Sequence, residues 1–170
     1  MSEFREELLI QMKKLKMFIM DVDGTLTDGK IYLGNNGEEM KAFNVKDGMG
    51  INLLHVEGII PVIITGRKAE IVNIRGKELS ITEIHQGIKD KLGIYTKLKE
   101  KYDLQDDQVS FIGDDLNDLP IMKKVGISFS VNDGVAEVKN YCDYCASKNG
   151  GEGAVREVID MVVQSRKELE

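Results

Sequence analysis

The sequence predicts a three-layer α/β fold with a mostly parallel central sheet and helices on both faces. Short apolar runs of strand length alternate with stretches of helical periodicity, which is typical of a parallel sheet covered on both sides. The chain has 170 residues, 42% of them hydrophobic, which suits one compact domain over residues 1–170. Polar clusters directly follow several apolar runs, as expected where a ligand binds at the carboxyl edge of such a sheet.

Each strand is predicted from a continuous apolar run bounded by polar or turn residues. Five runs meet this description, and a weaker one lies near Tyr144. The strands are expected at 17–22, 59–65, 81–85, 109–113 and 127–131.

The segments between these strands have helical spacing of apolar residues. In the last of them, Val155, Val158, Ile159, Val162 and Val163 fall on one face and charged residues on the other. Helices are expected at about 4–15, 48–57, 68–79, 90–102, 116–124, 134–140 and 153–168.

One segment, near residues 30–43, breaks the alternation of strands and helices. "KIYLGNNGEEMKAF" predicts a strand, an Asn-Asn-Gly turn and a second strand, so a β-hairpin should project where a helix was due. We expect Ile31, Leu33, Met40 and Phe43 to bury against something outside the domain core.

Composition excludes several classes of partner. A net charge of −6 and a pI near 5.1 disfavour nucleic acid, which requires a basic face. No apolar run approaches the roughly 20 residues needed to cross a bilayer, and "MSEFREELLIQMKKLK" does not read as a signal peptide, so a cytoplasmic protein is expected. Cys142 and Cys145 are too few for a zinc ribbon and are expected to be reduced thiols.

Four polar clusters fall at predicted strand ends. Asp21 and Asp23 follow the first strand, Thr65-Gly66-Arg67 follows the second, Lys91 comes after the third and "GDDLND" (113–118) follows the fourth. Several carboxylates in one crevice tolerate each other around Mg²⁺, and a lysine and a hydroxyl can hold phosphate oxygens. Together the clusters predict phosphoryl transfer through an aspartyl-phosphate.

Other interpretations of these residues fit the sequence less well. Singly, each cluster could be a turn or a helix cap. An EF-hand counted from Asp21 fails because Leu26 and Tyr32 replace the required Gly and Glu, and no nucleotide P-loop motif is present. A phospho-receiver domain is disfavoured because its phosphorylated aspartate lies on a different strand from its acidic pair, whereas Asp21 and Asp23 share one strand end.

The ordered series D-x-D-G-T, a strand ending in Thr, Lys and G-D-D-x-x-D resembles the haloacid dehalogenase superfamily, which implies a Rossmann-like fold and phosphatase activity. By this resemblance Asp21 is the nucleophile and Asp23 the general acid and base. Asp21, Asp114 and the backbone carbonyl of Asp23 would bind Mg²⁺, supported from outside by Asp115 and Asp118.

The same resemblance implies the groups that hold the substrate. Thr65 and Lys91 would bind the transferring phosphoryl group, with the Gly66 amide assisting. The gaps between motifs leave no room for a cap domain, so the site should be open to solvent or closed by a neighbouring subunit.

Over nearly the whole chain, "DVDGTLTDGKIY", "FNVKDGMGI", "ITGRKAEIV", "HQGIKDKL" and "NGGEGAVREV" are similar to the 3-deoxy-D-manno-octulosonate 8-phosphate phosphatases of lipopolysaccharide synthesis. This family implies a homotetramer joined by hairpins. Arg67 could pair with the substrate carboxylate through its guanidinium. By the resemblance it favours the eight-carbon substrate, because relatives that act on nine-carbon ulosonate 9-phosphates can carry Glu at this position. Lys46 and Arg75 are further candidates for substrate binding, and a non-catalytic relative with the same fold is a remote alternative.

Overall fold

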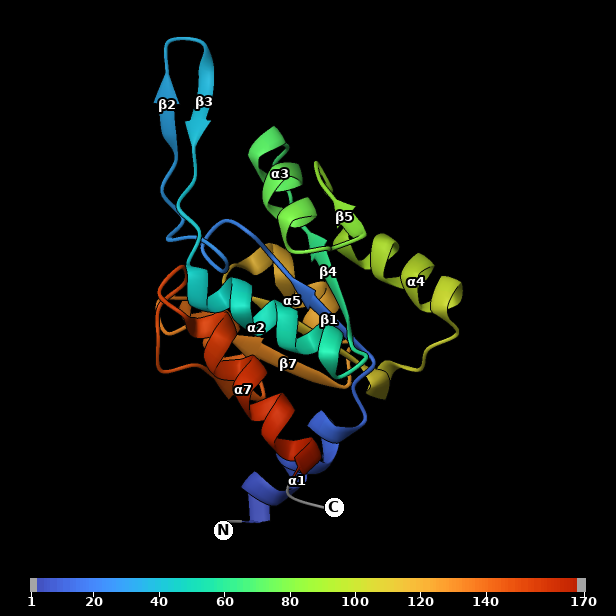
Figure 1. Ribbon diagram of the computed structural model, residues 1–170. Coiled ribbons are helices and arrows are strands. Elements are labelled where there is room, and N and C mark those ends of the chain that lie inside the picture. The colour runs from blue at the N-terminus through green and yellow to red at the C-terminus, as the bar shows by residue number, and fades with distance from the viewer. Residues whose placement is uncertain (1–2, 168–170) are drawn as a thin grey trace.

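Strand β1 (Met17–Met20) lies inside a six-stranded sheet in which every strand pairs in parallel with its neighbours. The computed structural model describes residues 3–167 (Figure 1). The strand order is β5-β4-β1-β6-β7-β8, so β1 lies between the second and fourth predicted strands. Besides β1, the sheet contains β4 (Ile60–Ile64), β5 (Glu83–His85), β6 (Val109–Gly113), β7 (Ile127–Ser130) and β8 (Tyr144–Cys145).

Helices cover both faces of this sheet because successive strand residues point to opposite sides. In β1, Phe18 and Met20 belong to one buried cluster and Met17 and Ile19 to the other. The first cluster packs against α1 (Glu3–Lys13), α2 (Val45–Val56), α3 (Glu70–Glu78) and α7 (Ala154–Lys167). The second packs against α4 (Lys91–Tyr102), α5 (Leu119–Met122) and α6 (Ala136–Tyr141).

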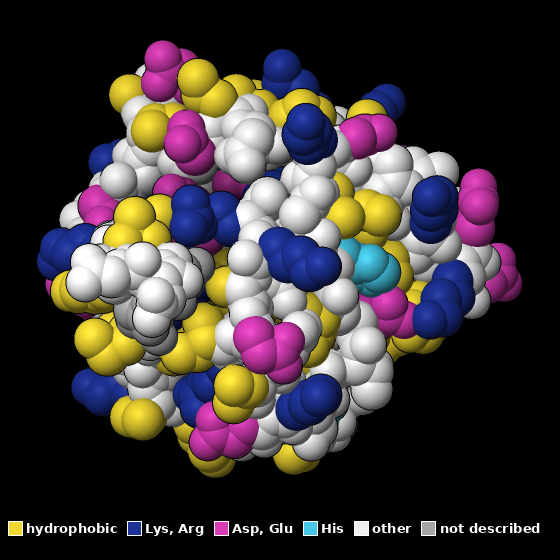
Figure 2. All heavy atoms as spheres, turned by 90° about the horizontal axis from the view of Figure 1, so that it is seen from above, with side chains coloured by type: hydrophobic (Ala, Val, Ile, Leu, Met, Phe, Trp, Pro, Cys, Tyr) yellow, Lys and Arg dark blue, Asp and Glu magenta, His cyan; other side chains and the backbone are white. Residues whose placement is uncertain are grey.

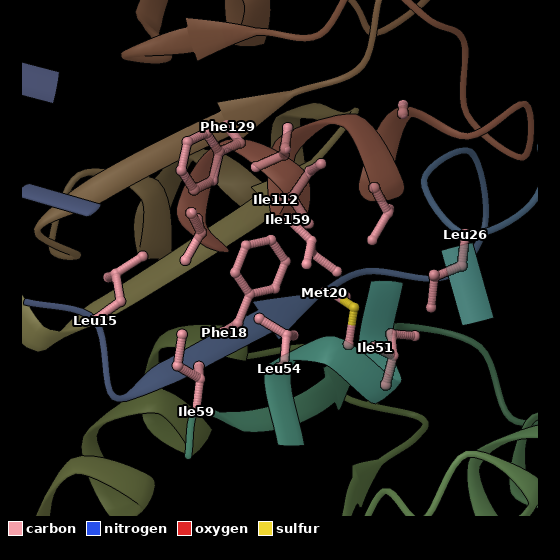
Figure 3. Packing of buried hydrophobic residues seen from close by; sticks show 14 of the residues in the cluster. Leu15, Phe18, Met20, Leu26, Ile51, Leu54, Ile59, Ile112, Phe129 and Ile159 are labelled. Atoms are coloured by element: carbon pink, nitrogen blue, oxygen red, sulfur yellow. The ribbon is translucent and has the colours of Figure 1, made fainter. Parts of the chain in front are cut away.

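The first cluster is the larger, and Figure 3 shows its side chains converging between the sheet and the helices. Phe18 from β1 and Phe129 from β7 stack with ring centroids 5.9 Å apart. Ile51 and Leu54 of α2 and Ile159 of α7 close the layer over them. This packing makes β1 a rigid base for the polar loop that follows it.

The three-layer prediction is confirmed, and the differences lie at element ends. Helix α2 begins at Val45 rather than 48 because the Asn44 side chain accepts a hydrogen bond from Lys46 N and caps the helix. The predicted helix 116–124 is a 3₁₀ turn (Leu116–Asp118) followed by the short α5, which has a proline in its first turn. Residue 168, the predicted end of the last helix, lies outside the described residues.

The hairpin is present and projects beyond the sheet layers (Figure 1). It pairs β2 (Tyr32–Gly34) with β3 (Gly37–Met40) in antiparallel fashion. Leu33 and Met40 are 69% and 59% exposed, and hydrophobic side chains gather around the hairpin in the view from above (Figure 2).

Phe43 corrects one expectation about this segment. It does not extend the exposed apolar surface but packs against the first core cluster, with the guanidinium carbon of Arg75 6.0 Å from its ring centre. Phe43 lies beyond β3, where the chain has already returned to the body of the fold.

None of the described helices could cross a bilayer.

Candidate active site

The loop after β1 brings the first acidic pair to the carboxyl edge of the sheet. Asp21 N still donates to Ile112 O of β6, so the backbone of Asp21 is held by the sheet. Gly24 then adopts a φ of +90°, and a Cβ at this position would lie 2.1 Å from Asp114 Oδ2. Glycine is required here both by its conformation and by the close approach of Asp114.

Two buried threonines hold this loop in shape. The Thr27 hydroxyl accepts from Gly24 N at 3.3 Å and Gly29 N at 3.2 Å, and donates to Val22 O. Thr25 donates to Asp114 Oδ1 at 3.1 Å. The D-x-D-G-T-x-T stretch therefore specifies a closed turn and also orients a carboxylate from the end of β6.

Three carboxylates converge at this edge. Oxygens of Asp21, Asp114 and Asp118 all lie within 4.8 Å of one another. Lys91, the first residue of α4, donates to Asp21 Oδ1 at 2.8 Å and Asp118 Oδ1 at 2.5 Å. Its side chain is 1% exposed, so this lysine is buried among the acids rather than solvated.

Burial and mutual repulsion disturb the ionisation of these groups. Burial, followed by repulsion from Asp118, raises the pKa of Asp21 to about 6 although Lys91 opposes the change. Burial, followed by repulsion from Asp21 and Asp118, raises the pKa of Asp114 to about 8. For Lys91, burial acts against the charged form, but Asp21 and Asp118 outweigh it and raise its pKa.

This arrangement fits a hard divalent cation. Carboxylate oxygens without sulfur or nitrogen ligands are the donors that Mg²⁺ prefers. Burial first, and repulsion between the carboxylates second, raise the pKa values of Asp21 and Asp114, and a bound cation would favour the charged forms of both groups.

Asp118 belongs to this cluster of three carboxylates, whereas Asp115 does not. Asp118 is fully buried, and its Oδ2 accepts from Asp114 N at 3.0 Å and Asp115 N at 3.3 Å. Both of its oxygens are therefore engaged by Lys91 or by backbone amides. The Asp115 carboxylate instead accepts from Leu116 N at 2.7 Å and caps the 3₁₀ turn.

A pocket of about 190 Å³ opens beside the carboxylates. The end of β4 forms one wall, where Thr65 N donates to His85 O and Thr65 O accepts from Ile88 N. Arg67 on the same wall is partly exposed, with its Nε 3.9 Å from Asp23 Oδ2. The residues that line the pocket are Asp21, Asp23, Thr65, Gly66, Arg67, Asp115 and Asn117.

Two other predicted substrate residues lie apart from this pocket. Lys46 is exposed in the first turn of α2, and its recorded hydrogen bonds use backbone atoms, with Asn44 and Arg156 as partners. Arg75 in α3 pairs with Glu78 Oε2 at 2.8 Å and lies over Phe43. Arg75 thus fills the junction of α3 with the base of the hairpin.

Sequence reasoning missed three residues of the site. Asn117 of the "GDDLND" motif lines the pocket, and Thr25 of D-x-D-G-T binds Asp114. Lys41, directly after β3, has a fully buried side chain whose Nζ donates to Asp23 Oδ1. No sequence signal marks Lys41, because a lysine at a hairpin base is ordinarily solvated.

Loop 149–153 packs against the Asp21–Thr27 turn. Gly151 N donates to Thr25 O at 3.1 Å, and a Cβ on Gly150 would lie 1.8 Å from Gly24 O. The Asp47 carboxylate of α2 holds the start of α7 by accepting from Arg156 N at 2.8 Å. The glycines before α7 therefore allow this loop and the turn after β1 to approach backbone to backbone.

Comparison with known proteins gives consistent matches. Residues 68–159 match the family of haloacid dehalogenase-like hydrolases. A 3-deoxy-D-manno-octulosonate 8-phosphate phosphatase of Escherichia coli (strain K12) is 43% identical over 164 residues, or 96% of this chain and 87% of the relative. The crystal structure of such a phosphatase from Yersinia pestis has a TM-score of 0.93 and 42% identity, covering 96% of this chain and 89% of its own.

A second solved structure carries ligands. The 3-deoxy-D-manno-octulosonate 8-phosphate phosphatase from Moraxella catarrhalis was crystallised with a magnesium ion, a phosphate ion and a KDO molecule. It has a TM-score of 0.93 and 41% identity, and the match covers 96% of this chain and 94% of that one.

Proposed function

Because this chain belongs to the haloacid dehalogenase-like hydrolases, within the 3-deoxy-D-manno-octulosonate 8-phosphate phosphatase family, we propose that it hydrolyses that sugar phosphate. The products are the free eight-carbon sugar acid and inorganic phosphate. The chain is a phosphoric monoester hydrolase that uses Mg²⁺. The observation that carries this function is the convergence of Asp21, Asp114 and Asp118 around Lys91 at the carboxyl edge of the sheet.

We propose Asp21 as the nucleophile. A carboxylate oxygen of Asp21 attacks phosphorus, and the bond from phosphorus to the sugar oxygen breaks as Asp23 donates a proton to that oxygen. In the second half-reaction Asp23 removes a proton from water, whose oxygen attacks phosphorus. The bond from phosphorus to Asp21 then breaks and phosphate leaves.

The remaining groups hold the reactants in place. Lys91 orients Asp21 through its 2.8 Å hydrogen bond, and Thr65 and the Gly66 amide lie beside the pocket where they can bind phosphoryl oxygens. The carboxylates of Asp21 and Asp114 and the Asp23 carbonyl would hold Mg²⁺, with Asp115 and Asp118 supporting them. When bound, Mg²⁺ polarises the phosphoryl oxygens and offsets the carboxylate charge.

Residues on the open side of the pocket would select the substrate. Arg67 is partly exposed there, and its guanidinium is suited to the carboxylate of an ulosonate. Lys46 and Arg75 do not line the pocket, and their hydrogen bonds and ion pairs involve Asn44, Arg156 and Glu78, so a contact with substrate would require them to move. Nine-carbon ulosonate 9-phosphates carry the same carboxylate and are the alternative substrates.

The test is phosphate release from a panel of sugar phosphates, with Mg²⁺ or with EDTA. We expect the eight-carbon ulosonate phosphate to have the highest kcat/KM and the nine-carbon compound to be slower. Asp21→Asn should abolish release while the fold is retained. An Asp21→Asn variant with full activity would refute the nucleophile, and preference for the nine-carbon substrate would refute the assigned substrate.

We propose that the protein acts as a homotetramer joined through its hairpins. The support is the exposed apolar surface of the hairpin, formed by Ile31, Tyr32, Leu33 and Met40. Such a surface on a projecting element is typical of a protein interface. Light scattering of the wild-type protein should give four times the monomer mass, and Leu33→Asp should lower the measured mass. A wild-type monomer would contradict the assembly.

The two free thiols support a reducing, cytoplasmic location.

A further inference from the structure

Lys41 contacts the proposed general acid, although no step described so far uses it. Its Nζ donates to Asp23 Oδ1, and its side chain is fully buried whereas that of Asp23 remains 17% exposed. A lysine loses hydration when it is buried, so such a position requires compensating partners. The site therefore contains a second buried lysine, in addition to Lys91, directed at a different aspartate.

The contact determines which oxygen of Asp23 remains available. Lys41 occupies Oδ1, whereas Oδ2 lies on the side of Arg67, whose Nε is 3.9 Å away. Asp23 and Arg67 both line the pocket, and Lys41 does not. Lys41 thus holds the carboxylate from behind, and Oδ2 is left to exchange a proton with the reacting groups.

The origin of Lys41 in the chain explains how it is held. It directly follows Met40, the last residue of β3, and the chain then returns to the core at Phe43. The hairpin base thereby supplies the side chain that holds the Asp23 carboxylate, and this side chain belongs to a residue outside the D-x-D-G-T loop. A shift of the hairpin base would move Lys41 and, through it, the Asp23 side chain.

We propose that Lys41 is a positioning residue that orients the Asp23 carboxyl for proton transfer to the leaving oxygen. This proposal rests on the proposed function, in which Asp23 protonates that oxygen while Asp21 attacks phosphorus. Misplacement of a reacting group by about 1 Å can cost on the order of 100-fold in rate. Loss of Lys41 should therefore slow leaving-group departure wherever that departure needs a proton.

The experiment compares three substrates that differ in two properties. The eight-carbon ulosonate 8-phosphate has a carboxylate and a poor leaving group, and arabinose 5-phosphate has a poor leaving group but no carboxylate. p-Nitrophenyl phosphate has a good leaving group that departs without protonation. Single-turnover rates of leaving-group release and steady-state KM values are measured for each.

The variants isolate the contact. Lys41→Met keeps the buried apolar stem and removes the ammonium, and Lys41→Arg keeps the charge. Lys41→Gln replaces Lys41→Met if the latter melts below the assay temperature. Lys30→Met is the matched control, because Lys30 lies at the other base of the hairpin, is exposed and pairs with Asp28. Asp23→Asn alone and with Lys41→Met completes a double-mutant cycle.

Lys41→Met should slow release from both sugar phosphates by about 10- to 100-fold, with KM changed by less than about threefold. Release from p-nitrophenyl phosphate should change by less than about threefold, and Lys41→Arg should recover part of the loss. In the Asp23→Asn background, Lys41→Met should add less than about twofold. Lys30→Met should match wild type.

Three results would overturn the proposal. Equal losses on all three substrates would indicate general damage to the site. A raised KM for the ulosonate alone would make Lys41 a substrate-binding residue, and an unchanged rate would leave it without a role in the reaction. The proposed function fails separately, through an active Asp21→Asn, so the two failures are distinguishable.

Discussion

Replacing Lys91 by methionine should destabilise the fold mainly when Mg²⁺ is absent. Lys91 Nζ lies 2.8 Å from Asp21 Oδ1 and 2.5 Å from Asp118 Oδ1, and all three side chains are nearly or fully buried. At an effective dielectric constant of about 20, unit charges about 4 Å apart attract by about 4 kcal/mol. Removing one partner of a buried pair costs about 3–5 kcal/mol, because the remaining charges stay buried without compensation.

We therefore expect Lys91→Met to lower the free energy of unfolding by about 3–5 kcal/mol in EDTA at pH 8. This would be a large part of the roughly 5–15 kcal/mol typical of a domain. A bound cation supplies positive charge to the same carboxylates, so the loss should be smaller in excess Mg²⁺. Urea denaturation followed by circular dichroism, with and without Mg²⁺, measures both values.

The control for this prediction is Lys89→Met. Lys89 is exposed two residues before Lys91, so its replacement makes the same change in net charge at the surface. It should alter stability by less than about 0.5 kcal/mol. A Lys91→Met loss below about 1 kcal/mol in EDTA, or an equal loss with and without Mg²⁺, would refute the view that Lys91 balances the acidic cluster.

Three further predictions concern groups around the site. Burial raises the pKa of Asp47 from 3.8 to about 6; the folded form then holds the proton more tightly, so stability should fall by up to about 3 kcal/mol as pH rises from about 4 through 6. Asp47→Asn should flatten this dependence in urea titrations, and an unchanged slope would contradict it. Gly150→Ala places a Cβ 1.8 Å from Gly24 O and should cost at least about 1–3 kcal/mol and slow phosphate release; a wild-type melting temperature would argue against this packing. Since the pKa of Asp114 is raised to about 8 without the ion, Mg²⁺ affinity by calorimetry should rise from pH 6 to 8 with proton release, and a pH-independent affinity would exclude this linkage.

Most of the fold could be predicted because its signals are local. Apolar runs and helical spacing place the strands and helices, and "GNNG" places the hairpin turn. The start of α2 was predicted at 48 but lies at Val45, because it is set by the hydrogen bond of one capping side chain, Asn44. Apolar spacing does not show such a cap. Phe43 could not be assigned to the core from its spacing in the hairpin, since its position depends on where the chain turns back.

The order of the motifs also predicted which side chains lie together at the site. Asp21, Thr65, Lys91 and Asp114 each follow a strand, and the carboxyl ends of parallel strands share one edge. The sequence by itself therefore determined the fold class, the acidic set and the family resemblance. Role assignments such as Asp23 as general acid remain predictions.

Only the tertiary structure decided which groups contact one another. Lys91 lies between Asp21 and Asp118, Lys41 reaches Asp23 from the hairpin base, and Gly150 touches the turn at Gly24. These contacts join segments from separate parts of the chain, and side-chain burial depends on packing around each residue. Local sequence does not determine that packing, so it cannot distinguish a lysine that is buried among carboxylates from one that is solvated.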